Sequence, residues 1–160
     1  LVVSDGEGSV RLYVPRSGWV DVASLDKEFA VQHLKQEALI EIDCLQTTID
    51  SFVQQHFTST KNILIKIDVE GAELKVLNGM TNTLQAGQAI CLVEILNRAA
   101  FDSIKSKLTN RYQIFGVREK APHLVLTSAY SREFKNYVCI PEEKIAILHS
   151  NQILCGRSLS

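Results

Sequence analysis

Three acidic residues stand where two predicted strands end near the middle of the chain. Asp68 ends the apolar run 62–68, Glu70 follows two residues later, and Glu94 lies near the end of the apolar run 89–96. In open α/β sheets, ligands bind beyond the carboxyl ends of the strands. If the two strands are neighbours, the carboxylates converge and provide either a general base or oxygen ligands for a hard cation. We therefore take Asp68, Glu70 and Glu94 as the candidate catalytic residues.

A purely structural role is the alternative for residues of this segment. Acids that open a helix complement its dipole, each by about 0.3 to 1 kcal/mol. We expect Gly71 to permit a tight turn, and Glu73 to be a solvated residue of the first helical turn. Lys66, a cation in the middle of an apolar strand, has to reach water or an acid. Glu94 also needs a polar partner, because its strand is apolar.

The elements around these acids predict an α/β fold. Residues 62–68 and 89–96 are short, mostly apolar runs, typical of strands in a parallel sheet. Residues 72–84 lie between them and carry apolar side chains near helical spacing, namely Leu74, Val76, Leu77, Met80 and Leu84. Strand, helix and strand form a βαβ unit, for which a right-handed crossover is the rule. We therefore expect one helix between two neighbouring parallel strands.

The later part of the chain predicts that the sheet continues. A helix over about 99–108 leads to a strand at 112–117. The runs 123–127 and 136–140 are joined by a short polar segment, and Pro141 closes the second run. Because proline within sheets is largely confined to edge positions, we expect these two runs to form an antiparallel edge.

The first third of the chain predicts two strands and two helices. Residues 9–14 and 38–46 alternate between apolar and polar side chains, as half-buried strands do. We expect the first to belong to a short antiparallel ribbon and the second to lie near a sheet edge. Asp26 is a candidate cap for a short helix, and Thr48 or Asp50 is a candidate cap for the next one.

Composition narrows the classes of function. The 160 residues are 46% hydrophobic and 22% charged, which predicts one folded domain, residues 1–149, and a loose tail, residues 150–160. The net charge of −1 disfavours binding to nucleic acid or to a membrane surface, and no apolar run reaches the ~20 residues of a membrane span. The four cysteines form no metal-binding pattern, so we expect no metal site built from them and a reducing, cytoplasmic location.

The segment LIKIDVEGAELKVLNGM, residues 64–80, resembles the signature of the FkbM family of S-adenosylmethionine-dependent methyltransferases. Other segments agree with the family in order and spacing, namely VVSDGEGSVRLYV, QTTIDSFV, CLVEI and NYVCIP. The resemblance covers about residues 2–145, nearly the whole chain.

The resemblance implies a Rossmann-like class I methyltransferase sheet, mostly parallel with an antiparallel C-terminal edge, and S-adenosylmethionine as the cofactor. Val3, Ser4 and Asp5 would border the adenine, while Asp68 and Glu70 would stand beside the cofactor and the acceptor. One of these two acids would be a general base, or a ligand of a divalent cation that acidifies the acceptor. The implied reaction is O-methylation of a hydroxyl on a sugar or another small metabolite.

The glycine-rich cofactor turn of the family, and the acid that binds the ribose, are not found in this sequence, which opens within an apolar run at Leu1. The resemblance therefore implies the C-terminal part of an N-terminally truncated methyltransferase domain, and we expect the isolated chain to bind the cofactor weakly and to be inactive. A sheet without all its strands exposes an edge, so we also expect self-association. The alternative is a non-enzymatic binding or interaction module that retains part of a Rossmann-like fold.

Overall fold

The computed structural model describes residues 1–16, 23–33, 38–57, 62–108, 111–118 and 124–150. The chain forms two compact units, each with its own sheet. Unit 1 comprises Leu1–Thr58 and Asp68–Thr81, and unit 2 comprises Ser59–Ile67 and Asn82–Ser160. Beyond residue 150, the predicted tail lies outside the described residues. The predicted domain boundary stays a prediction.

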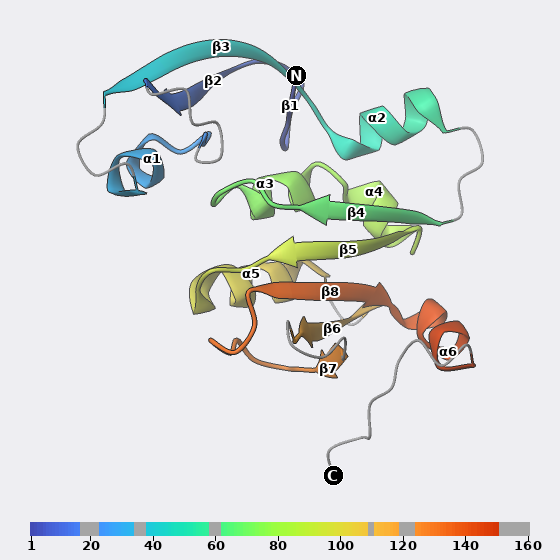
Figure 1. Cartoon of the computed structure of the whole chain (residues 1–160). Helices are drawn as coiled ribbons and strands as arrows, with labels where there is room; N and C mark the ends of the chain where they lie inside the picture. The colour runs from blue at the N-terminus through green and yellow to red at the C-terminus, as the bar shows by residue number, and fades with distance from the viewer. Residues whose placement is uncertain (17–22, 34–37, 58–61, 109–110, 119–123, 151–160) are drawn as a thin grey trace. The chain divides into compact units, whose positions relative to one another are not determined.

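Unit 1 contains a three-stranded sheet in the order β1-β3-β2 (Figure 1). Its strands are β1 (Val2–Val3), β2 (Gly8–Pro15) and β3 (Leu39–Thr47), and its helices are α1 (Lys27–His33), α2 (Ile49–His56) and α3 (Glu73–Asn78). β1 is parallel to β3, whereas β2 and β3 form a long antiparallel ladder from Gly8 opposite Gln46 to Pro15 opposite Leu39. Both predicted strands are confirmed, and so is the antiparallel ribbon expected at the first of them. The expectation that the second lies near a sheet edge is wrong, because β3 pairs on both sides and is the central strand.

Side-chain caps explain where the first two helices of unit 1 begin. The Asp26 carboxylate accepts hydrogen bonds from the backbone N–H groups of Glu28 (2.9 Å) and Phe29 (3.1 Å) at the start of α1. The Thr48 hydroxyl accepts from the N–H of Ser51 (3.1 Å) and so caps α2. Both arrangements satisfy donors that have no partner inside the helix. The predicted cap at Asp26 is confirmed, and Thr48 rather than Asp50 is the cap of α2.

Unit 2 contains a five-stranded sheet in the order β4-β5-β8-β6-β7. The strands are β4 (Ile63–Ile67), β5 (Ala89–Glu94), β6 (Tyr112–Val117), β7 (Leu124–Leu126) and β8 (Asn136–Pro141). The helices are α4 (Thr81–Gln85), in this unit from Asn82, α5 (Arg98–Leu108) and α6 (Glu142–Ser150). β4 is parallel to β5, as predicted, and it is an edge strand of this sheet. Self-association through such an edge stays a prediction.

The place of β8 corrects the expected antiparallel edge. β8 does not pair with β7 but lies between β5 and β6 and is antiparallel to both, as Figure 1 shows. Its side chains at Tyr137, Cys139 and Ile140 are buried, which suits a strand with neighbours on both sides. Pro141 is the last residue of β8, where a missing N–H disrupts the ladder least. Both sheets are therefore mixed, and the mostly parallel, Rossmann-like arrangement is not confirmed.

The core of unit 2 lies between this sheet and its helices. The rings of Phe101 in α5 and Tyr137 in β8 are both fully buried, with centroids 5.3 Å apart. Cys91 and Cys139 lie opposite each other on β5 and β8, and burial raises the pKa of the Cys91 thiol to about 12. Such thiols behave as small hydrophobic side chains.

Of the helices in the described part of the chain, none has both the length and the apolar character that a membrane span requires.

The sequence predicts one helix over residues 72–84. The structure has two helices there, because helical structure is interrupted after Asn78. A Cβ at Gly79 would lie 2.0 Å from the carbonyl oxygen of Ser4, so only glycine permits this close approach of backbone to backbone. The carbonyl of Gly79 also accepts a hydrogen bond from the N–H of Asp50 (3.0 Å). These tertiary contacts end α3 although the apolar pattern continues into α4.

Candidate active site

A tight turn follows β4 and carries one of the predicted acids. The N–H of Ala72 donates to the carbonyl of Val69 (3.3 Å), which closes a four-residue turn. Its central residues, Glu70 (φ 47°) and Gly71 (φ 90°), are both in the left-handed region, as in a type I′ turn. Among the described residues, Glu70 is the one non-glycine with a positive φ. The turn predicted at Gly71 is confirmed.

Side chains from three elements hold this turn. The hydroxyl of Ser24, which is 1% exposed, donates to the carbonyl of Glu70 (3.2 Å). The N–H of Gly71 donates to Oε1 of Glu73 (3.0 Å), and the ring of Phe29 lies 3.0 Å from where a Gly71 Cβ would be. Glu73 is only 7% exposed, so the expectation of a solvated residue is wrong. The reason is that its carboxylate turns inward to the N–H of Gly71.

The β4–β5 register brings two of the acids to one end of the sheet. Ile67 lies opposite Val93, so the next residues, Asp68 and Glu94, leave the parallel strands side by side. Glu70 is linked to Asp68 through one intervening residue. This closeness follows from the strand pairing and from the short link along the chain.

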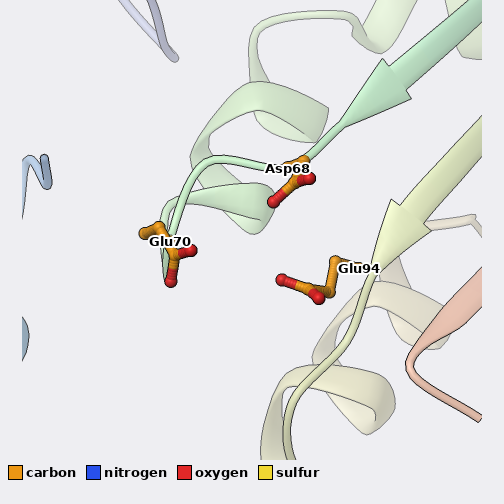
Figure 2. Close-up of side chains that lie close together, drawn as sticks. All are labelled: Asp68, Glu70 and Glu94. Carbon is orange, nitrogen blue, oxygen red and sulfur yellow. The ribbon is translucent and has the colours of Figure 1, made fainter. Parts of the chain in front are cut away.

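The three carboxylates converge. One carboxylate oxygen from each of Asp68, Glu70 and Glu94 lies within 4.8 Å of the others. Figure 2 shows the three side chains directed toward a common space, from the end of β4, the turn and the end of β5. Asp68 is exposed, and Glu70 and Glu94 are half-buried. The predicted convergence is confirmed, whereas the catalytic roles stay predictions.

This arrangement suits two kinds of chemistry. Carboxylate oxygens can accept a proton from a hydroxyl group, and they are also the ligands that hard divalent cations prefer. Lys66, on the strand that leads to Asp68, is exposed, which agrees with the expectation that this cation is not enclosed in apolar surroundings. The site thus presents acidic groups at a sheet end that solvent can reach.

The residues expected to border a cofactor lie together at the end of β1 and on the turn that follows it. Val3 is half-buried and pairs with Thr47, Ser4 is 2% exposed, and Asp5 is exposed. The N–H of Ser4 donates to the carbonyl of Thr47 (2.9 Å), and its hydroxyl donates to the carboxylate of Asp5 (3.1 Å). The carbonyl of Ser4 faces Gly79. The cofactor-binding role of these residues stays a prediction.

Glu7 holds the same turn and was not found by sequence reasoning. Its Oε1 accepts hydrogen bonds from the hydroxyl of Thr47 (3.0 Å) and from the N–H of Thr48 (3.1 Å). Hydrogen bonds from Ser51, Thr48 and Thr47 lower the pKa of Glu7 below its ordinary value. Glu7 thus ties the turn after β1 to the first turn of α2. No local sequence signal marks this role, because the donors lie some forty residues away.

Comparison with known proteins identifies the family. The model of the methyltransferase FkbM domain matches residues 3–121, which include all the predicted site residues. Searches of curated proteins and of solved structures gave no match. Because the matched segment spans well over half of the chain, this protein belongs to the FkbM methyltransferase family.

Proposed function

We propose that this protein is a methyltransferase that uses S-adenosylmethionine to methylate a hydroxyl oxygen of a sugar or another small metabolite. The family match supports methyl transfer. The observation that carries the proposal is the convergence of Asp68, Glu70 and Glu94 at the carboxyl ends of two parallel strands. In a Rossmann-like sheet of the class I methyltransferase type, substrates bind at this edge.

The residues present are suited to the proposed cofactor. Val3 offers half-buried apolar surface and Asp5 an exposed carboxylate, which are two kinds of group that a nucleoside can contact. Bound S-adenosylmethionine would supply an electrophilic methyl carbon. The chain's own residues would align the acceptor hydroxyl with that carbon, and positioning of this kind supplies much of the rate in a displacement reaction.

The acids would deal with the proton of the acceptor. A carboxylate of Asp68 or Glu70 would accept the proton that the acceptor hydroxyl loses, while the bound cofactor would supply the methyl group and leave as the neutral thioether. Glu94 would support the pair from β5, within 4.8 Å of both carboxylates. Alternatively, Asp68 and Glu70 would hold a divalent cation, which would supply Lewis-acid activation of the acceptor hydroxyl, and water would take the proton.

A charge-neutralising double substitution tests the proposal. Asp68→Asn with Glu70→Gln removes both negative charges and keeps the size of both side chains, so we expect methyl transfer by the complete enzyme to fall by about 100-fold or more. The measurement is transfer of a labelled methyl group from S-adenosylmethionine to a panel of sugars and hydroxylated metabolites. The matched control is Asp102→Asn with Glu133→Gln, which alters two exposed acids of unit 2. Turnover that the first pair leaves intact would contradict the proposed site.

Two further measurements separate the alternatives. Turnover that ceases with a chelator and returns with Mg²⁺ assigns Asp68 and Glu70 to a cation, and turnover that a chelator does not change assigns one of them as the base. Calorimetry with S-adenosylmethionine tests the enzyme class itself. Micromolar binding supports the proposal, whereas a silent titration fits either a truncated domain or a fold repurposed as a binding or interaction module.

A further inference from the structure

Glu70 adopts a backbone conformation that its own residue type disfavours. Its φ of 47° lies in the left-handed region, where the Cβ of an L-residue crowds the backbone. The first central position of a type I′ turn prefers Gly, Asn or Asp, and Glu70 is none of these. Such an outlier persists only where the surrounding structure fixes it.

Two buried side chains fix one peptide group of this turn. The carbonyl of Glu70 and the N–H of Gly71 belong to the same peptide plane. The hydroxyl of Ser24 donates to that carbonyl (3.2 Å), and the carboxylate of Glu73 accepts from that N–H (3.0 Å). Relaxation of Glu70 to a negative φ requires this plane to rotate, and rotation would break both hydrogen bonds.

Ser24 is itself held firmly in unit 1. It exchanges backbone hydrogen bonds with Tyr13 of β2, from its own N–H (3.0 Å) and to its own carbonyl (2.9 Å). Its hydroxyl oxygen also accepts from the N–H of Asp26 (3.0 Å). One half of the support for the Glu70 peptide is therefore anchored to β2 by an isolated backbone bridge, and the other half is the side chain of Glu73.

We infer that Glu73 is a positioning residue, which holds the peptide between Glu70 and Gly71 so that the carboxylate of Glu70 faces those of Asp68 and Glu94. The inference rests on the proposed function, in which Glu70 meets the acceptor. A simple dipole-complementing role does not account for Glu73, because that role needs no specific partner and is compatible with full exposure. Glu73 is instead 7% exposed, with an oxygen on a specific N–H.

The comparison of Glu73→Ala with Glu73→Gln tests the inference. Glutamine keeps an oxygen that can accept from the N–H of Gly71, whereas alanine removes it. We expect Glu73→Ala to lower kcat by on the order of 100-fold, because a misplacement of about 1 Å has that effect, and to leave the affinity for S-adenosylmethionine unchanged. Glu73→Gln retains turnover within about threefold of the starting protein. Equal damage by both variants would overturn the inference, since it would show that the charge matters and the acceptor does not.

A second readout does not depend on activity. Amide hydrogen exchange at Gly71, followed by NMR, accelerates at least about tenfold in Glu73→Ala and stays slow in Glu73→Gln. Slow exchange in both variants would overturn the inference even if turnover fell. If the complete, unsubstituted enzyme transfers no methyl group, the proposed function fails, and the exchange data still decide whether Glu73 holds the turn.

Removal of the other support guards against a variant that does not fold. Ser24→Ala deletes the hydrogen bond to the Glu70 carbonyl and keeps the backbone pairing with Tyr13. We expect a lower kcat and faster exchange at Gly71, in the same direction as for Glu73→Ala. If circular dichroism shows that Glu73→Ala is unfolded, the variants Ser24→Ala and Glu73→Gln together test the positioning role. No change in Ser24→Ala, together with loss of turnover in Glu73→Gln, would then refute the positioning role.

Discussion

Unit 1 contains two turns that follow short strands, and a glutamate carboxylate supports each of them in a different way. Glu7 is exposed and accepts from several donors, among them the hydroxyl of Thr47 and the N–H of Thr48. Glu73 is buried, and its carboxylate accepts from the N–H of Gly71. A carboxylate shared among several donors tolerates the loss of one, whereas a buried carboxylate that holds one specific N–H does not. The turn that carries Glu70 therefore depends strongly on each of its buried supports, Glu73 and Ser24, whereas the support of the turn that carries Ser4 and Asp5 is distributed over several donors.

We expect the substitution Glu70→Gly to have the largest effect. It separates the cost of the backbone conformation at residue 70 from the contribution of the Glu70 carboxylate to methyl transfer. Glu70→Gly removes the Cβ that makes a positive φ costly, so we expect the free energy of unfolding to rise by about 1 kcal/mol. The same change deletes a proposed catalytic carboxylate, and methyl transfer should fall by about 100-fold or more. Urea unfolding and the methyl-transfer assay measure the two quantities. Glu70→Gln is the control, with loss of activity and no gain in stability.

The substitution Gly79→Ala tests the turn that carries Ser4 and Asp5, because a side chain at residue 79 would crowd the backbone of that turn. Gly79→Ala would place a Cβ 2.0 Å from the carbonyl oxygen of Ser4, so backbone must move. We expect a loss of about 1 to 3 kcal/mol in the free energy of unfolding, together with weaker binding of S-adenosylmethionine by the displaced turn. Gly6→Ala is the matched control, because its Cβ would meet only the side-chain amide of Gln46 at 3.3 Å. Equal effects of the two substitutions would contradict this account of the close approach.

Acid pH should weaken the hydrogen bonds that the exposed Glu7 carboxylate accepts. We expect this effect to be smaller than those of the two glycine substitutions above. Hydrogen bonds, the largest from Ser51, lower the pKa of Glu7 below its ordinary value of 4.5. A carboxyl group with a lowered folded-state pKa stabilises the fold above its unfolded pKa, and this contribution is lost as the pH falls through the folded value. Glu7→Gln should therefore reduce the pH dependence of unfolding below about pH 4.5. The check is thermal unfolding between pH 6 and pH 3, with the unsubstituted protein showing the steeper decline.

Much of the sheet and of the acidic site could be predicted from the sequence. The runs that became β4 and β5 are apolar and β-branched, and the rule that neighbouring parallel strands end at one edge is enough to bring Asp68 and Glu94 together. Glu70 follows because one intervening residue limits how far it can lie from Asp68. These are local patterns, and the β4–β5 pairing joins segments that one helical stretch separates.

Contacts between distant segments could not be predicted in the same way. The inward turn of Glu73 depends on the left-handed turn at Gly71, and the break after Asn78 depends on the carbonyl of Ser4. The apolar spacing of residues 72–84 is the same with or without that break. The position of β8 also depends on which strands it pairs with, and alternation along one strand does not specify its neighbours.

The order of strands has a consequence for how this protein is made. β5 and β6 are neighbours of β8 and not of each other, and β8 follows both of them in the chain and ends at Pro141. Until β8 has been made, the backbone groups of β5 and β6 that pair with β8 lack that partner. Synthesis from the N-terminus thus prolongs a state with incomplete backbone pairing, the kind that chaperones bind. Closure of the larger sheet therefore has to wait for β8, the last of its strands in the chain.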